Sequence, residues 1–415
     1  MKKFKGSKAL VMILALAMVL VFAVGCGGKD APAEPAAPPA DTGSSAPAEE
    51  PAEEPAGDVQ TKTIGFYADA ADSYYADMND ALQALAAQDP ETDWTVDYKV
   101  GQSTADEQLK AVEDFITAGY DAIIVIQNSV DTTSECIAKA KDAGIPYFGA
   151  AHNFASAPNA LDSTGSTNYD FVQGGRLAGQ DALANGVKHV INIEGVLGQG
   201  SASDQSLGFL LAYEEAGKSF GEKADGSPWT AEEVATLKPS MSDIKGDYDI
   251  AVVFWASGNW MADPAQKAMT DAITSLGADG WDGAYVQNNP MTEGAINAMT
   301  DGGLSTDDYW LGSMNGREVS WQWTKDGVLS MDVNQSSCLE GALLYQMIKE
   351  YFATGSVAKN HVHPYLTGYT KATIAELEPS LVPETDVAAF VAGVNSGDIV
   401  IDINDPKFLP IPNYK

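Results

Sequence analysis

Two consecutive tyrosines, Tyr74 and Tyr75, follow the apolar run "TIGFYA", and two acids, Asp69 and Asp72, lie just before them. Tyrosine rings stack on flat apolar surfaces, and carboxylates accept hydrogen bonds from hydroxyl groups. Because successive side chains of a helix or strand point in different directions, the two rings cannot both enter one core. We therefore favour stacking of the pair on a ligand such as a sugar ring, with a core position for one tyrosine as the alternative. Either aspartate could instead cap the helix that we expect to begin near Ala76.

The other chemistry-bearing residues do not form a catalytic pattern. The segment "HVH" places His361 and His363 on one face of a strand, but no third metal ligand stands at a suitable spacing. We expect an exposed strand there and no metal site. The loop "GVLGQGSAS" lacks the Lys-Ser/Thr pair of a phosphate-binding loop, and the chain has no G-x-S-x-G or H-E-x-x-H motif. We therefore predict a protein that is not an enzyme, has no catalytic residues and needs no cofactor.

Apolar, strand-like runs alternate with helical patterns from about residue 63 onward. The run "TIGFYA" precedes "DMNDALQALAAQ", and "DAIIVIQ" precedes "TTSECIAKAKDAG". Continuous apolar runs bounded by Gly, Asp or Pro and separated by helices are typical of parallel sheets covered on both faces. We therefore predict a doubly wound α/β fold. The globular part of about 350 residues is too long for one ordinary core, which indicates two lobes.

In such sheets, ligands bind beyond the carboxyl ends of the strands. The segments that follow the predicted strands are rich in amides, acids and aromatic residues. Asn288 and Asn315 could also satisfy backbone groups of their loops, but their position at strand ends favours ligand contact. The side chains that we expect in the ligand site are Asp69, Asp72, Tyr74, Tyr75, Gln127, His152, Asn153, Gln205, Trp260, Asn288, Asn315 and Gln335.

The first 25 residues combine a basic start with an apolar run over residues 9–24, which is the pattern of an export signal. The apolar run is shorter than the roughly 20 residues that cross a bilayer, and it has no basic flank after it. The segment "AVGC" resembles a bacterial lipobox, which implies cleavage and lipidation of Cys26, although Ala23 stands where leucine is usual. Residues 26–60 are rich in Ala, Pro and Glu and predict a solvated linker. We expect an extracytoplasmic protein held at the cell membrane by its lipid alone.

The chain carries a formal net charge of −34, and removal of the four lysines of the signal leaves −38. Such a surface repels phosphate backbones, so we expect no nucleic-acid partner. Solubility is a sufficient explanation of the charge. Cys136 and Cys338 both lie in helical patterns that nothing in the spacing brings together, so we expect no disulfide between them.

Four segments occur in the same order as in a known family. They are "QSTADEQLKAVEDFITAGYDAIIV", "STNYDFVQGGRLAGQ", "QNNPMTEGAINAM" and "LGSMNG". The series resembles the type I periplasmic-binding proteins of the ribose and galactose class, which are the capture subunits of ABC importers. The resemblance extends over about residues 63–355. It implies two doubly wound lobes, joined by crossover hinges, that close on a small ligand.

The resemblance also implies roles for individual residues. The aromatic pair after the family's first strand falls on Tyr74 and Tyr75, and the facing aromatic of the second lobe falls on Trp260. Polar positions of the family's site fall on Asp72, Asn288, Asn315 and Gln335.

Two departures from the family pattern leave the ligand open. Family sugar binders often carry Asp-Arg where this chain has Ala151 and His152, and an Arg where it has Ser203 and Gln205. The missing guanidinium groups would donate paired hydrogen bonds. The grasp of a small pentose or hexose is weakened without them.

We predict that lobe 1 comprises residues 61–166 and 336–364 and that lobe 2 comprises residues 167–335. Residues 365–415 form a C-terminal extension that we assign to neither lobe. The resemblance implies a monomeric lipoprotein that captures a sugar or polyol and delivers it to ABC permease subunits, and we expect this function. The alternative is a sensory receptor for a small polar signal, such as an autoinducer-like molecule or a nucleoside, that acts without transport. Lobe closure would be the same event in both.

Overall fold

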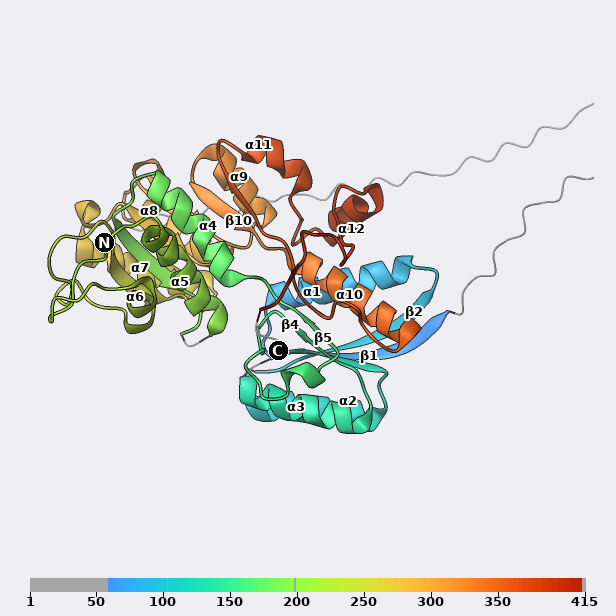
Figure 1. Ribbon diagram of the computed structural model, residues 1–415. Coiled ribbons are helices and arrows are strands. Elements are labelled where there is room, and N and C mark those ends of the chain that lie inside the picture. Colours follow the sequence, from blue (N-terminus) through green and yellow to red (C-terminus); the bar gives the residue numbers. More distant parts are fainter. Residues whose placement is uncertain (1–58, 103, 128, 198, 413–415) are drawn as a thin grey trace, which may run out of the picture. The chain divides into compact units, whose positions relative to one another are not determined.

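The computed structural model describes residues 59–412 except 103, 128 and 198, all within the unit Pro55–Lys415 (Figure 1). The predicted signal peptide, Cys26 and nearly all of the predicted linker lie outside the described residues. Within the described range, every helix is too short or too polar to cross a membrane. The described residues form two α/β lobes, each built on its own sheet.

The sheet of the first lobe contains seven strands among the described residues. In spatial order they are β13 (Leu409–Pro410), β11 (His361–His363), β5 (Gly165–Thr167), β4 (Tyr147–Ala150), β3 (Ala122–Ile126), β1 (Gln60–Ala68) and β2 (Thr92–Val100). Neighbouring strands are parallel, except that β13 runs antiparallel to β11. Parallel neighbours need crossover connections, which the helices between the strands provide.

Alternating side chains direct the two faces of this sheet into separate cores. Ile64 and Phe66 of β1 belong to one core, whereas Tyr67 belongs to the other. Because both faces are covered, β1 and β3 are apolar throughout their buried parts and not only at every second residue. The covering helices are α1 (Ser73–Gln88) and α10 (Ser337–Thr354) on one face, and α2 (Ala105–Ala118) and α3 (Val130–Ala143) on the other.

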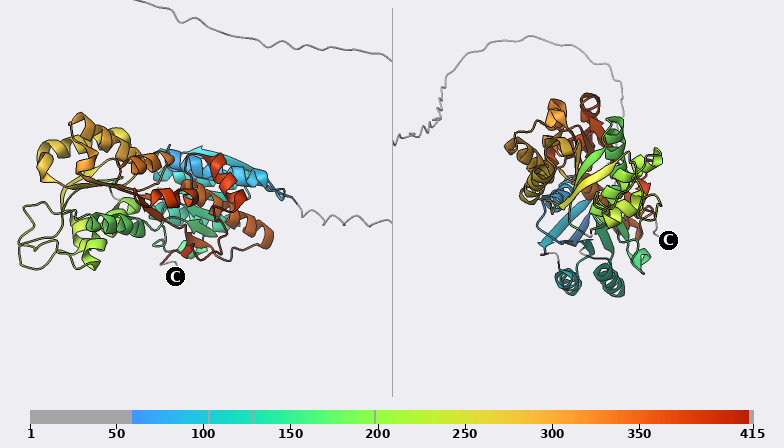
Figure 2. Two further views of the ribbon diagram at one scale, coloured as in Figure 1. Left: turned by 90° about the horizontal axis from the view of Figure 1, so that it is seen from above. Right: turned by 90° about the vertical axis from the view of Figure 1, so that its left-hand side faces the viewer.

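The sheet of the second lobe contains six strands among the described residues. In spatial order they are β12 (Thr367–Thr370), β10 (Met331–Asn334), β9 (Trp310–Ser313), β8 (Gly283–Val286), β6 (His189–Glu194) and β7 (Ala251–Ser257). Only β12 runs antiparallel to its neighbour in this described set. Its faces are covered by α4 (Phe171–Ala184), α5 (Gly200–Glu215) and α6 (Ala231–Leu237) on one side, and by α7 (Ala262–Leu276) and α8 (Asn289–Asp301) on the other (Figure 2).

Shorter elements complete the described chain. They are α9 (Glu318–Asp326), α11 (Ile374–Leu377), α12 (Val387–Ser396) and the 3-10 turns η1 (Ala160–Asp162), η2 (Ala278–Gly280), η3 (Thr306–Asp308) and η4 (Glu378–Ser380). The predicted doubly wound α/β fold in two lobes is confirmed.

The C-terminal extension contributes to both lobes. It supplies β12 to the second sheet and β13 to the first. The chain therefore passes between the sheets after β5, after β10 and after β11, and it passes once more between β12 and β13. We predicted no lobe for residues 365–415, and the structure divides the described part, residues 365–412, between the two.

The histidines of β11 are buried, so our expectation of an exposed strand was wrong. His361 and His363 are 7% and 6% exposed. His361 Nδ1 lies 2.9 Å from Ser166 Oγ, and His363 Nδ1 lies 2.6 Å from the carbonyl oxygen of Asn168. Burial lowers the pKa of His361 to about 4, so the imidazole is neutral at pH 7. The physical reason is that β13, from the end of the chain, pairs with β11 and makes it an interior strand.

Candidate functional site

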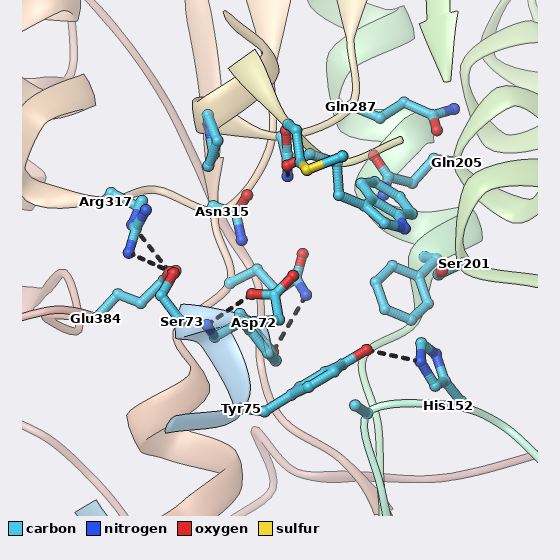
Figure 3. Close-up of a pocket in the computed structure, with 18 of the residues that line it drawn as sticks. Asp72, Ser73, Tyr75, His152, Ser201, Gln205, Gln287, Asn315, Arg317 and Glu384 are labelled. Atoms are coloured by element: carbon cyan, nitrogen blue, oxygen red, sulfur yellow. Dashed lines mark hydrogen bonds and ion pairs between the residues drawn. The ribbon is translucent and has the colours of Figure 1, made fainter. Parts of the chain in front are cut away.

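A cavity of about 380 Å³ lies where the carboxyl ends of the two sheets meet (Figure 3). Segments after β1 and β4 line it from the first lobe, and segments after β6, β7, β8 and β9 line it from the second. Its volume falls in the range of about 300–1,000 Å³ that is usual for small-molecule sites. Its position is the one expected for ligands of open α/β sheets.

Nine of the twelve predicted site residues line this cavity. They are Asp72, Tyr74, Tyr75, His152, Gln205, Trp260, Asn288, Asn315 and Gln335. Their role in ligand binding stays a prediction, but the structure brings them together from segments far apart in the chain.

The other three predicted residues are not part of the lining. Gln127 supports the loop after β4, because its Nε2 donates to the carbonyl oxygens of His152 and Asn153 at 3.3 and 3.0 Å. The Asn153 side chain accepts a hydrogen bond from the Ala155 amide at 2.8 Å. Asp69 is 3% exposed and lies behind Tyr75; burial raises its pKa to about 6, and a hydrogen bond with Tyr75 opposes that shift.

The lining also contains residues that we did not predict. Those with polar or aromatic side chains are Ser73, Phe171, Ser201, Gln287, Arg317 and Glu384. Gln287 stands beside Asn288 at a strand end that the strand-end rule covers, but we did not select it as a ligand residue. Arg317 lies two residues after Asn315, and only its positive charge distinguished it from the neighbouring residues of the sequence. Glu384 follows no strand, so no pattern in the sequence marked it.

Asp72 both caps a helix and faces the cavity. It is the N-cap of α1, and its Oδ1 accepts a hydrogen bond from the Tyr74 amide at 2.8 Å (Figure 3). The helix begins at Ser73, earlier than we expected. Burial raises the pKa of Asp72. Capping and ligand contact are therefore compatible for this residue, because one carboxylate oxygen caps the helix and the side chain still lines the cavity.

Both tyrosines line the cavity while their hydroxyl groups are held by protein partners. The Tyr74 hydroxyl lies 2.7 Å from Glu340 Oε2, and Gln335 Nε2 donates to it at 3.2 Å. The Tyr75 hydroxyl lies 3.0 Å from His152 Nε2. Both rings pack on the core of the first lobe, and Tyr75 is 9% exposed. Core and ligand platform are thus not alternatives for this pair, since each ring has one side in the core and one at the cavity.

Buried titratable groups stand behind the tyrosines. Burial raises the pKa of Glu340 to about 8 and lowers the pKa of His152 to about 4. At pH 7 Glu340 is therefore a neutral acid and His152 a neutral imidazole. The two groups bonded to the tyrosine hydroxyls, Glu340 and His152, therefore offer hydrogen bonds without net charge.

Trp260 on the second lobe is held from three sides. Its Nε1 donates to Gln199 Oε1 at 2.6 Å, and its carbonyl oxygen accepts from Asn288 Nδ2 at 3.2 Å. A Cβ added at Gly195 would lie 2.0 Å from the Trp260 ring, so the indole packs directly on that glycine. The backbone of Trp260 has φ +61°, a left-handed conformation that is rare for a bulky residue. Such strain at a cavity wall is typical of functional sites.

Amide side chains fix the loops that carry them. Asn288 is the N-cap of α8, where its Oδ1 accepts from the Met291 amide at 2.9 Å. Asn315 has φ +111°, and its Oδ1 accepts from the Asn289 amide at 3.2 Å. Gln205 Oε1 accepts from the Tyr285 hydroxyl at 3.0 Å. Asn288 uses both polar atoms of its amide for the protein, because its Nδ2 also donates to the Trp260 carbonyl. The Asn315 and Gln205 oxygens are held by the protein, and these contacts fix the direction of the remaining amide nitrogens, Nδ2 and Nε2.

Arg317 is the only Lys or Arg among the lining residues that the structure describes. Its Nε lies 3.1 Å from Glu384 Oε1, and its Nη2 donates to Ser73 Oγ at 3.1 Å (Figure 3). Nη2 also lies 3.7 Å from Asp77 Oδ2, so this side chain from the second lobe contacts α1 of the first. With Asp72 and Glu384 also in the lining, acids outnumber the single cation. An anionic ligand would meet carboxylates here, whereas neutral hydroxyl groups find both donors and acceptors.

Metal and thiol chemistry find no support in the described part of the chain. No group of three or more His, Cys, Asp or Glu side chains in that part could hold a metal ion. Cys136 and Cys338 are both buried and free, and burial raises the pKa of Cys136 to about 11. The arrangement of aromatic walls and fixed amides can bind a small polar ligand by stacking and hydrogen bonds.

Comparisons with known proteins agree with one another. A family model described as "Periplasmic binding protein domain" matches residues 64–356. A galactofuranose-binding protein of Escherichia coli K12 is 23% identical over 282 residues, which cover 66% of this chain and 78% of that protein. A xylitol-binding protein of Mycolicibacterium smegmatis is 27% identical over 199 residues, which cover 47% of this chain and 46% of that protein.

Solved structures share the fold. A galactofuranose-binding protein matches with a TM-score of 0.62 and 21% identity, over 76% of this chain and 96% of that one. A solute-binding protein of an ABC transporter from Bacillus halodurans C-125, solved with bound myo-inositol, matches with a TM-score of 0.60 and 22% identity, over 78% of this chain and 99% of that one. At such identities the likeness shows the fold.

Proposed function

The chain belongs to the periplasmic binding protein domain family, and on this premise we propose that it captures a neutral sugar or polyol between its lobes and delivers it to an ABC importer. Members of this family are solute-binding proteins and not enzymes. The named homologues bind galactofuranose and xylitol, and the Bacillus halodurans protein holds myo-inositol. All three ligands are neutral polyhydroxy compounds, and this shared chemistry supports the proposal.

One observation carries the proposal. Aromatic rings from both lobes, Tyr75 and Trp260 among them, line one cavity together with helix-capping carboxylate and amide side chains. Rings stack on the apolar face of a sugar, and fixed amides and carboxylates select the hydroxyl groups around its edge. The partners are already held in place by the protein, so little ordering is needed when the ligand binds.

Closure of the two lobes on the ligand is the signal that a transporter would recognise. We propose that permease subunits of an ABC importer bind the closed form of the monomer. The family implies an extracytoplasmic location. We further propose that Cys26 carries a lipid and that residues 26–60 tether the binding lobes to the membrane. Stable attachment needs more than one acyl chain, because a single chain binds membranes only weakly.

Native mass spectrometry and calorimetry of the chain without its first 25 residues test the proposal. A panel of sugars, polyols, nucleosides and amino acids would show which class binds. Binding should raise the free energy of unfolding by about 2.7 kcal/mol at a hundredfold excess over Kd. Binding of amino acids or nucleosides with no response to any sugar or polyol would contradict the proposal.

A sensory receptor is the second candidate. The fructose-binding periplasmic domain of a hybrid two-component system shares the fold, with a TM-score of 0.60 and 15% identity. Measuring the uptake of radiolabelled ligand by cells in which the gene is deleted distinguishes import from sensing. Loss of uptake supports import, whereas normal uptake with a lost transcriptional response supports sensing.

A further inference from the structure

A strap, which we define as residues 381–387, crosses between the lobes near the end of the chain (Figure 1). At its start, Leu381 packs with Tyr369 and Ile374 on the second lobe. After it, Phe390 and Val391 of α12 join the core of the first lobe. The family model ends at residue 356, so the strap lies outside the part of the chain that defines the family.

The strap is attached to the hinge after β10 by paired hydrogen bonds. The Asn334 side chain donates to the Val382 carbonyl at 3.0 Å and accepts from the Val382 amide at 2.8 Å. Ser336 Oγ donates to the Pro383 carbonyl at 2.5 Å. Asn334 thus satisfies both backbone groups of one strap residue, as a neighbouring strand would.

A second set of contacts fixes the turn at Glu384. The Glu318 carboxylate accepts hydrogen bonds from the amides of residues 384, 385 and 386, each at 3.1 Å. It also accepts from Thr385 Oγ1 at 2.8 Å. The backbone that carries the Glu384 side chain is therefore held on both sides.

The Glu384 side chain points into the ligand cavity, where it is 1% exposed (Figure 3). One carboxyl oxygen, Oε1, lies 3.1 Å from Arg317 Nε. The other, Oε2, is buried and has no hydrogen-bond partner among the residues that the structure describes. A buried polar atom without a partner is costly, and such an atom at a cavity wall is satisfied when a ligand supplies the partner.

A hydroxyl group is the ligand group that fits this oxygen. Burial raises the pKa of Glu384, and the neighbouring Arg317 opposes that shift. A hydroxyl donates to an ionised carboxylate and accepts from a protonated carboxyl, so it fits either form. An anionic group would be repelled by the ionised form and by Asp72 in the same lining.

We propose that Glu384 of the strap is a specificity-determining ligand residue, whose Oε2 hydrogen-bonds one hydroxyl of the bound sugar or polyol while Arg317 holds Oε1 in place. This inference rests on the proposed function and deepens it. It adds to the family's site a wall that comes from the C-terminal extension. The strap also couples ligand binding to the hinge, because the residue that binds the hydroxyl group lies in a segment that is hydrogen-bonded to Asn334 and Ser336 at the crossover after β10.

Calorimetry with deoxy sugars tests the inference. The probes are D-galactose, L-arabinose, D-allose, xylitol and myo-inositol, with the monodeoxy analogues of the probe that binds most tightly. We expect E384A to weaken the best probe about 10- to 100-fold. One deoxy analogue should bind the wild type with a Kd raised by a similar factor over the parent probe. It should bind E384A with nearly the same Kd as the parent probe does, because the hydroxyl that it lacks is the partner of Glu384.

Glu378 provides a matched control from the same extension. It pairs with Lys325 of α9 at 2.6 Å and does not line the cavity, so E378A should leave Kd unchanged. If E384A does not fold, E384D keeps the charge and shortens the side chain, and it should lose affinity for the same hydroxyl. If wild type and E384A bind the best probe with equal Kd, the inference is overturned. The same holds if each deoxy analogue loses affinity by the same factor in both proteins. Either result would leave the proposed function standing. Failure of the wild type to bind any probe would overturn the proposed function, and the inference with it.

Discussion

Replacing Tyr75 with alanine should weaken both the ligand-free fold and ligand binding. The ring is 9% exposed and belongs to the core of the first lobe, yet it also lines the cavity. Truncating a buried aromatic costs about 3–5 kcal/mol of unfolding free energy, and the open side of this ring places it at the lower end, about 3 kcal/mol. In a body of about 350 residues this corresponds to a fall in Tm of about 4 °C. Loss of stacking should raise Kd by about 5- to 150-fold.

Two controls separate these effects. Tyr75→Phe keeps the ring and removes only the hydroxyl, with its 3.0 Å hydrogen bond to His152 and its hydrogen bond with Asp69, so it should cost about 1–3 kcal/mol of stability and leave Kd nearly unchanged. Tyr351 packs on the same core but is not part of the lining, so Tyr351→Ala should lower Tm at constant Kd.

Calorimetric Kd values and thermal unfolding of the ligand-free variants decide the matter. A fall in Tm for Tyr75→Ala with Kd unchanged would refute stacking and leave a core residue. An unchanged Tm with lost affinity would refute the packing argument.

Three further perturbations test other parts of the structure. Burial raises the pKa of Glu340 to about 8, so its native form keeps a proton that the unfolded chain loses, and this group should lower stability by about 2 kcal/mol from pH 6.5 to 8. In the unfolded chain His152 titrates near its ordinary pKa of about 6.5, so the Glu340 contribution is measured as the difference between denaturant unfolding of wild type and of E340Q, which should show a smaller fall. Gly195→Ala places a Cβ 2.0 Å from the Trp260 ring and should weaken ligand binding as Trp260→Ala does, whereas equal Kd values in titrations of wild type and G195A would show that the indole does not contact ligand. Cys26→Ser should release the protein from the membrane fraction with Kd unchanged, and full retention of the variant there would count against lipidation.

The alternation of apolar runs and helical patterns was sufficient to predict the two doubly wound sheets. Local chemistry dictates such elements, because covered parallel strands must be apolar on both faces and their helices must have one apolar face. The strand-end rule then located residues such as Asp72, Asn288 and Asn315, since parallel strands present their carboxyl ends at one edge. The same rule misplaced Gln127 and Asn153, because a loop side chain at that edge can turn inward to bond its own loop.

Only the tertiary structure decided the role of the C-terminal extension. Whether His361 is exposed depends on whether β13 pairs with β11, and nothing within the segment "HVH" carries that information. Arg317 and Glu384 meet at 3.1 Å although they are far apart in the chain, and each is an ordinary charged residue in its local sequence. Their pairing follows from contacts of the strap backbone with the Asn334 and Glu318 side chains, which form only when the second lobe is folded. Long-range hydrogen bonds of this kind leave no periodic pattern, because they join single residues at unrelated positions and not the repeating faces of a helix or strand.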